Sequence, residues 1–174
     1  MGLDILYGIS TTFNKMIEII DNFLTKKECE LINKTLTNNF FPWYYINNVS
    51  EENDGYFYFV HLVFDNNRIN SPQIMDLLKP LIDKLKIKAL VRIKINLYTK
   101  TEKIIEHKMH TDTKFKCKTS LYYVNTNNGY TGLKNNKKIE SISNRLLNFD
   151  SQVPHFSTNC TDKNYRININ FNYF

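Results

Sequence analysis

The chain has 174 residues, of which 42% are hydrophobic and 14% aromatic. That composition is typical of a globular protein, and the length suits a single domain over residues 1–174 that buries a core without disulfides. The three cysteines form no CxxC pair, and the 19 lysines behind the net charge of +6 are spread along the chain, so neither a zinc ribbon nor a nucleic-acid-binding surface is favoured.

The N-terminal residues carry no recognisable targeting signal. Residues 1–13 lack the basic region and the small-residue cleavage site of a secretory signal. Leu6 stands where the myristoylation pattern requires Ser or Thr. No apolar run approaches the ~18 residues that span a bilayer. We therefore expect a cytoplasmic protein with no membrane partner.

The first half of the chain predicts a mixture of strands and helices. Residues 17–23 are strand-like, and Thr25 and Glu28 then form a capping box that begins a helix over roughly 26–37. Aromatic and β-branched residues predict strands at 41–46 and 56–64. A second amphipathic helix follows Ser71-Pro72, and Pro80 should kink it or split it in two. The polar segments 47–56 and 65–72 have the character of lids that select a substrate.

From residue 89 onward the pattern changes to short β-rich segments separated by turn residues. We expect eight strands, in VRIKINLY, HKMHTD, TSLYYVN, YTGLK, KIESIS, RLLNFD, VPHFST and RININFNY. Such closely spaced strands predict a jelly-roll or cupin-like barrel, that is, a double-stranded β-helix. With helices first and strands after, the fold class is α+β, mainly β, and the N-terminal helices should pack on one sheet.

The four histidines are candidate metal ligands. Residues i and i+2 of a strand share a face, so His110 and Asp112 form a chelating pair that His107 cannot join. A third ligand must come from elsewhere, either His61 or His155. Two imidazoles and one carboxylate leave three open positions on a metal, which suits non-haem Fe(II) that binds a co-substrate and O₂.

Arg166 adds a second element to this site. In RININFNYF it shares a face with three asparagines, opposite Ile167 and the other apolar residues. An inward-facing arginine is costly to bury without an anionic partner. A dicarboxylate that chelates the metal at one end and pairs with the guanidinium at the other would supply that partner.

Over residues 17–174 the chain resembles the Fe(II)/2-oxoglutarate oxygenases, in particular the prolyl-4-hydroxylase-like branch. The resemblance rests on H-T-D at 110–112, S-L-Y-Y-V-N at 120–125, N-R-L-L-N-F-D…P-H-F at 144–156 and R-I-N at 166–168. It implies that His110, Asp112 and His155 hold the iron. It also implies that 2-oxoglutarate contacts a basic residue and several tyrosines and asparagines, here Arg166, Tyr98, Tyr123, Asn96 and Asn168.

The resemblance further implies a dioxygenase that uses Fe(II), 2-oxoglutarate and O₂, with ascorbate as a supporting reductant. Such an enzyme hydroxylates a C–H bond of a peptide side chain or a small molecule and releases succinate and CO₂. One alternative is an oxygenase acting on nucleic acid, but Asn172 stands where that branch carries a second arginine. The other alternative is a non-catalytic jelly-roll binding module.

Overall fold

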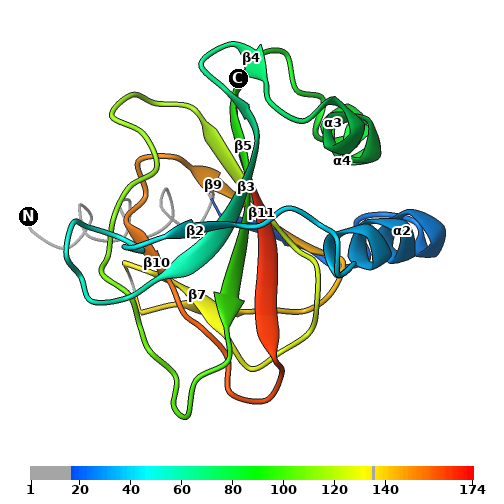
Figure 1. Cartoon of the computed structure of the whole chain (residues 1–174). Coiled ribbons are helices and arrows are strands. Elements are labelled where there is room, and N and C mark those ends of the chain that lie inside the picture. Colours follow the sequence, from blue (N-terminus) through cyan, green and yellow to red (C-terminus); the bar gives the residue numbers. More distant parts are fainter. Residues whose placement is uncertain (1–16, 135) are drawn as a thin grey trace, which may run out of the picture.

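The computed structural model describes residues 17–134 and 136–174 (Figure 1). The N-terminal residues on which the targeting predictions were made lie outside this range. No helix in the described part of the chain has the length and apolar character needed to cross a membrane.

A large, mostly antiparallel sheet forms the centre of the molecule (Figure 1). Its strands run in the order β1-β9-β6-β11-β5-β3-β2, and the short β4 pairs with β3. Strand β11 therefore lies in the middle of the sheet, between β6 and β5. The bounds are β1 Glu18–Ile20, β2 Tyr44–Ile46, β3 Tyr58–Asp65, β4 Arg68–Ile69, β5 Leu90–Thr99, β6 Lys118–Tyr123, β9 Arg145–Asp150 and β11 Tyr165–Tyr173.

Three helices cover one face of this sheet, as predicted. Helix α2 (Lys26–Leu36) begins at the expected capping box, in which the Thr25 hydroxyl accepts from the Glu28 amide and the Glu28 carboxylate accepts from the Thr25 amide. The second amphipathic segment is split into α3 (Pro72–Leu77) and α4 (Lys79–Leu85), and Pro80 lies in the first turn of α4. The main core is formed by residues of the helices and the sheet, including Ile32, Leu36, Leu78, Leu81, Ile93, Ile95, Ile167, Ile169 and Phe171.

A second, three-stranded sheet lies across the other face of the large sheet. Its order is β10-β7-β8, with β7 at Tyr130–Leu133, β8 at Lys138–Glu140 and β10 at His155–Ser157. A smaller apolar cluster joins the two sheets, with Leu121 and Leu147 from the large sheet against Leu133 and Ile139 from the small one. The strand pairings of the described residues do not close the two sheets into a barrel.

The predicted strand at HKMHTD is wrong. Residues 100–117 run as an irregular segment whose backbone pairing with the rest of the structure is limited to isolated bridges, one of them between His110 and His155. The segment is rich in charged and exposed residues, so it offers no continuous apolar face to pack. Strand parity was therefore not a valid reason to group His110 with Asp112. The other seven segments expected after residue 89 do form strands.

Candidate active site

The side of β11 that faces away from the helices is polar. Arg166, Asn168, Asn170 and Asn172 alternate with apolar residues that belong to the main core. Antiparallel register places inward-facing residues of neighbouring strands beside them, and Asn168, for example, pairs with Asn96 of β5 and Tyr123 of β6. A buried polar wall therefore lies between the two sheets.

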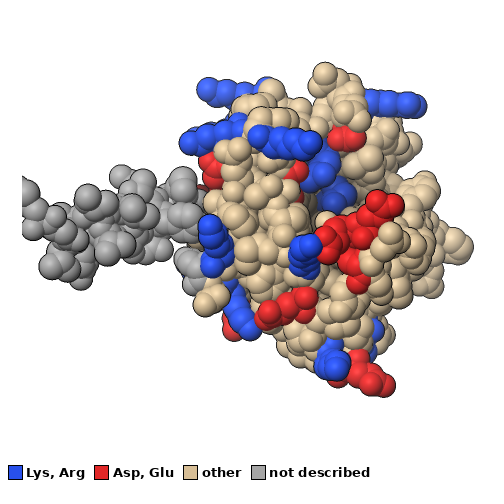
Figure 2. Space-filling model, turned by 90° about the vertical axis from the view of Figure 1, so that its left-hand side faces the viewer, with Lys and Arg blue, Asp and Glu red and all other residues tan. Residues whose placement is uncertain are grey.

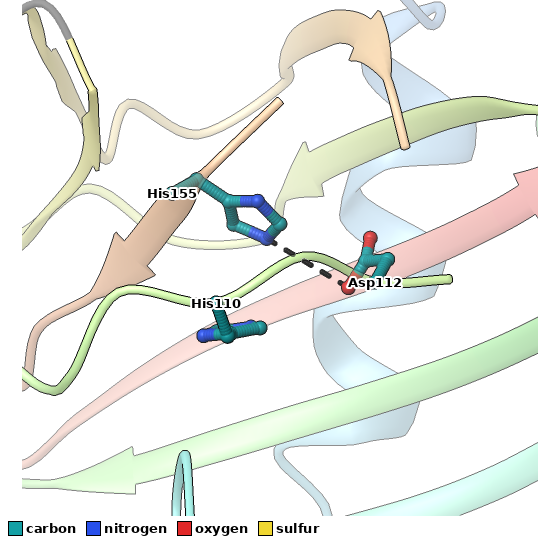
Figure 3. Close-up of side chains that lie close together, drawn as sticks. All are labelled: His110, Asp112 and His155. Atoms are coloured by element: carbon teal, nitrogen blue, oxygen red, sulfur yellow. Dashed lines mark ion pairs between the residues drawn. The ribbon is translucent and has the colours of Figure 1, made fainter. Parts of the chain in front are cut away.

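His110, Asp112 and His155 meet at this wall (Figure 3). Their potential ligand atoms all lie within 4.8 Å of one another, and His155 Nε2 is 3.7 Å from Asp112 Oδ1. The backbones of the two histidines exchange a pair of 2.9 Å hydrogen bonds, and the Asp112 amide donates to the Ser151 carbonyl. Backbone pairing with the segment around β10 thus brings the three residues together.

The hydrogen bonds of the two imidazoles fix which nitrogen is free. His155 Nδ1 lies 2.9 Å from the Val153 carbonyl, and His110 Nδ1 lies 3.2 Å from the Lys108 carbonyl. A carbonyl can only accept, so each Nδ1 must carry the proton and each Nε2 keeps its lone pair. Burial lowers the pKa of His110, and the neighbouring His155 lowers it further. In each ring Nε2 is therefore the nitrogen available to a metal.

Asp112 is held as a carboxylate by several donors. Asn170 and Asn172 donate to its oxygens at 3.0–3.3 Å, and Thr119 donates at 3.0 Å. Burial alone raises the pKa of Asp112, but His155, Arg92 and the two asparagine amides outweigh it and lower the pKa to about 2. The carboxylate is therefore charged and oriented without a metal.

Arg166 is fully buried and has no carboxylate partner among the described residues. Its guanidinium donates to the Thr158 carbonyl at 3.2 Å and to the Thr131 hydroxyl at 3.1 Å, while Nε has no partner. The rings of Tyr98 and Tyr123 lie 5.4 and 5.7 Å from the guanidinium carbon. Burial lowers the pKa of Arg166, as expected for a cation without a counter-charge.

The other residues proposed to contact 2-oxoglutarate lie in the same region. Asn96 donates to Asn168 at 2.9 Å, and Tyr123 donates to the Thr131 hydroxyl at 2.8 Å. A cavity of about 40 Å³ is bordered by Asn96, Asn168 and Thr131 together with the triad, whereas Tyr123 and Arg166 are not part of its lining. It is lined by Val49, Tyr58, Lys94, Asn96, Tyr98, His110, Asp112, Leu121, Thr131, His155, Phe156, Ser157, Asn168 and Asn170. Of the two segments given a lid-like character, only 47–56 contributes to this lining, through Val49.

The two remaining histidines lie outside the triad. His61 is on the helix-covered side of β3, where Nδ1 is 2.9 Å from the Pro42 carbonyl and the ring contacts Phe41. His107 stacks on Tyr98, and its Nδ1 is 3.0 Å from the Ser157 hydroxyl. Of the two candidates for the third ligand, the structure therefore brings His155 to the pair and keeps His61 away.

Several residues of the site were not singled out from the sequence. Thr131 links Arg166 to Tyr123, and Thr119 supports Asp112, yet threonines in β-rich segments carry no distinctive signal. Asn170 and Asn172 were recognised as sharing the face of Arg166, and that alternation could have predicted their approach to the metal ligands. Lys94 follows from the same parity on β5, since it lies opposite Asn170.

The sequence matches no protein-family model and no curated protein, but the structure is similar to several solved ones. A prolyl hydroxylase from Trichoplax adhaerens, in complex with a hypoxia inducible factor peptide fragment, superimposes with a TM-score of 0.63 at 18% identity, over 100% of this chain and 94% of that one. A 2OG-Fe(II) oxygenase family protein from Burkholderia pseudomallei gives 0.68 at 11% identity, over 99% and 92%. A prolyl-4-hydroxylase from Pseudomonas putida gives 0.60 at 12% identity, over 97% of each chain.

The chain thus has the fold of the 2OG-Fe(II) oxygenases. Prolyl hydroxylases are among the structures that share it over nearly their whole length. The predicted fold class is confirmed, as a two-sheet jelly roll with helices on the large sheet.

Proposed function

We propose that this protein is an Fe(II)- and 2-oxoglutarate-dependent dioxygenase that hydroxylates a C–H bond of a peptide side chain or a small molecule. The observation that carries the proposal is the pairing of two features in one buried site. Two histidines and one carboxylate offer ligand atoms to a metal, and an arginine without a counter-charge donates to Thr131, which lines the same cavity.

The residues fit Fe(II). Two imidazole nitrogens and a carboxylate oxygen are the ligand set of non-haem Fe(II) oxygenases, and such a set leaves positions open for further ligands. Hydrogen bonds already orient each of the three ligands. His110 and His155 each donate from Nδ1 to a backbone carbonyl, and Asp112 accepts from asparagine side-chain amides. Outer partners of this kind hold metal ligands in position and raise their affinity.

The residues also fit a dicarboxylate co-substrate. Arg166 Nε has no hydrogen-bond partner, and one terminal nitrogen of Arg166 donates to Thr131, which lines the cavity. A carboxylate beside Arg166 would neutralise a fully buried cation, and Thr131 and Tyr123 offer hydroxyls next to it. We propose Tyr98, Asn96 and Asn168 as further contacts because they line the same cavity.

When bound, Fe(II) and 2-oxoglutarate supply O₂ activation coupled to oxidative decarboxylation of 2-oxoglutarate to succinate and CO₂. The residues of the chain hold the metal ligands in position and limit the access of water. Asn170, Asn172 and Thr119 keep Asp112 charged and fixed, and the apolar residues Leu121 and Phe156 limit water in the cavity. Ascorbate would serve as a supporting reductant.

A peptide substrate is supported by the Trichoplax prolyl hydroxylase, whose structure contains a peptide. Tyr56 and Phe57, which are 39% and 47% exposed, line a neighbouring cavity that shares Tyr98 with the candidate site, and we propose that such a ligand contacts them.

The proposal is tested by anaerobic addition of Fe(II) and then 2-oxoglutarate to the metal-free protein. We expect a visible metal-to-ligand charge-transfer band, and slow conversion of 2-oxoglutarate to succinate once air is admitted. Asp112→Ala should lose both signals, whereas Asp76→Ala, at an exposed position on helix α3, should keep both. Absence of the band in the wild-type protein would refute the proposal and leave a non-catalytic binding module.

A further inference from the structure

Lys94 is a second positive charge in the cavity, and the proposed mechanism does not use it. It lies on β5 directly opposite Asn170, one of the two asparagines that hold Asp112. Its side chain lines the cavity together with His110, Asp112 and His155. Residues Asn96 and Tyr98 continue the same face of β5 toward Arg166. Lys94 is therefore on the metal side of the cavity.

The ammonium of Lys94 lacks a counter-ion. Across residues 17–134 and 136–174, no carboxylate lies within the 4.0 Å limit of an ion pair with it. Its contacts are a 3.2 Å hydrogen bond to the Tyr58 hydroxyl and a position 5.5 Å from the centre of the Tyr58 ring. Burial lowers the pKa of Lys94 and nearby Arg92 lowers it further, and the opposing effects of Tyr98 and Asp112 are smaller. A cation in this setting is stabilised by an anion that enters the cavity.

Lys94 and Tyr58 together form a pair of donors. The ammonium has protons left after its bond to the Tyr58 oxygen, and the Tyr58 hydroxyl proton has no partner among the described residues. The two polar atoms are 3.2 Å apart, so both can donate to one carboxylate. The only carboxylate that lines the cavity, Asp112, already accepts from Asn170, Asn172 and Thr119.

We propose that Lys94, with Tyr58, binds a carboxylate of the substrate and so selects acidic substrates. This inference rests on the proposed function and specifies its substrate class. Arg166 already provides a cation for 2-oxoglutarate on the far side of Tyr98, so a dicarboxylate co-substrate does not require Lys94. A neutral or basic substrate would leave the partly buried charge of Lys94 without an ion pair.

Binding of a substrate carboxylate would also explain why a lysine occupies position 94, where an ammonium is otherwise unfavourable. Inward positions of β5 are occupied by polar but uncharged residues at Asn96 and Tyr98, and a neutral side chain at position 94 would avoid the cost of burying an ammonium. Arg92, the next inward residue, is different because it already pairs with Asp112 at 3.5 Å. Of the two cations on β5, Arg92 has an ion-pair partner among the described residues and Lys94 has none, so Lys94 is the one available to an anionic ligand.

The experiment uses full-length protein loaded with Fe(II) and 2-oxoglutarate, and it measures the stimulation of succinate formation by matched probes. One arm compares the N-acetyl derivatives of the common amino acids, which carry a free carboxylate, with their uncharged carboxamides. The other arm compares peptide pools that contain glutamate with the same pools containing glutamine. The first arm detects a small-molecule acid and the second an acidic side chain in a peptide.

We expect acidic probes in one arm to stimulate turnover and their neutral partners to do so at least roughly tenfold less, because a hydrogen-bonded charge pair contributes more than one factor of ten. Lys94→Met should lose that preference, and Lys94→Glu should reverse it toward lysine-containing pools. The exposed Lys100→Met is the matched control and should behave as wild type.

The charge-transfer band separates the possible failures. If the band forms in wild type and in Lys94→Met with similar 2-oxoglutarate affinity, the co-substrate site is intact and folding is preserved. Equal stimulation by acidic and neutral probes, or none by either, would then overturn the role of Lys94 while the proposed oxygenase function stands. A large loss of 2-oxoglutarate affinity in Lys94→Met would also overturn it, because Lys94 would then belong to the co-substrate site.

Discussion

Replacing Arg166 by methionine separates the cost of the buried charge to protein stability from its contribution to binding 2-oxoglutarate. Met has a similar length and removes the charge, so the metal-free variant should be no less stable than wild type, as replacement of buried ionic groups by apolar ones is often neutral or stabilising. The losses are two hydrogen bonds, to the Thr158 carbonyl and the Thr131 hydroxyl, each worth about 1.5–3 kcal/mol when the donor is charged. Desolvation of a fully buried guanidinium costs several kcal/mol, which offsets that loss.

Arg166→Met should also weaken the binding of 2-oxoglutarate and so abolish the stabilisation that this co-substrate gives to the folded protein. Removing one partner of a buried arginine–carboxylate pair costs about 3–5 kcal/mol, so the affinity for 2-oxoglutarate should fall roughly 10²- to 10⁴-fold. Ligand at 100 times its Kd stabilises the wild-type protein by about 2.7 kcal/mol, and the same concentration should leave Arg166→Met almost unchanged. Arg166→Lys keeps the charge but not the planar guanidinium, so its affinity for 2-oxoglutarate should lie between those of the wild-type protein and Arg166→Met.

The assays are anaerobic titration of the charge-transfer band and urea unfolding with and without 2-oxoglutarate, with Fe(II) present in both. Arg68→Met, at an exposed position on β4, is the control and should match wild type in both assays. Binding of 2-oxoglutarate by Arg166→Met within threefold of wild type would refute the role of Arg166. A variant destabilised by more than about 3 kcal/mol in the absence of ligand would refute the argument that the buried charge is costly.

Three further outcomes follow from contacts around the site and the helices. Asn172→Leu removes a donor to Asp112 and should weaken Fe(II) binding about 10- to 100-fold in an anaerobic titration; unchanged affinity would contradict the role of that amide. Thr25→Ala removes the capping box of α2 and should lower the free energy of unfolding in urea by about 1 kcal/mol, whereas an unchanged midpoint would show that the cap is dispensable. Burial lowers the pKa of His107 from 6.5 to about 4, so between these pH values the unfolded chain binds a proton that the folded protein does not. The free energy of unfolding should therefore fall by about 3 kcal/mol as the pH drops from about 6.5 to about 4. His107→Gln should flatten this part of the plot of unfolding free energy against pH, and an equal slope in both proteins would exclude His107 as its source.

Much of the fold was predictable because local signals agreed with the tertiary structure. The capping box fixed the start of α2, Pro80 marked the divided helix, and period-two alternation in β11 correctly separated the core face from the polar face. The same alternation placed Arg166 inward, which was the basis for expecting a dicarboxylate beside it.

The metal cluster was predicted in part for the wrong reason. His110 and Asp112 do approach each other, but they lie on an irregular segment whose position depends on backbone pairing with His155 and Ser151, about 40 residues away in the chain. Parity is a property of strands and does not apply there. Pairing between distant irregular segments leaves no periodic trace in the sequence, so the resemblance to a family was needed to choose His155.

The central position of β11 has a consequence for how the protein folds. This strand is the last of the described chain, yet it lies between β5 and β6, which precede it by about 75 and 50 residues. Neither neighbour can complete its pairing until β11 arrives, and contacts of such long range slow folding. Because β11 also carries Arg166 and the asparagines that hold Asp112, no partly formed sheet can assemble the site. Acquisition of iron and co-substrate should therefore be the final event of folding, which would keep an incomplete chain from activating oxygen.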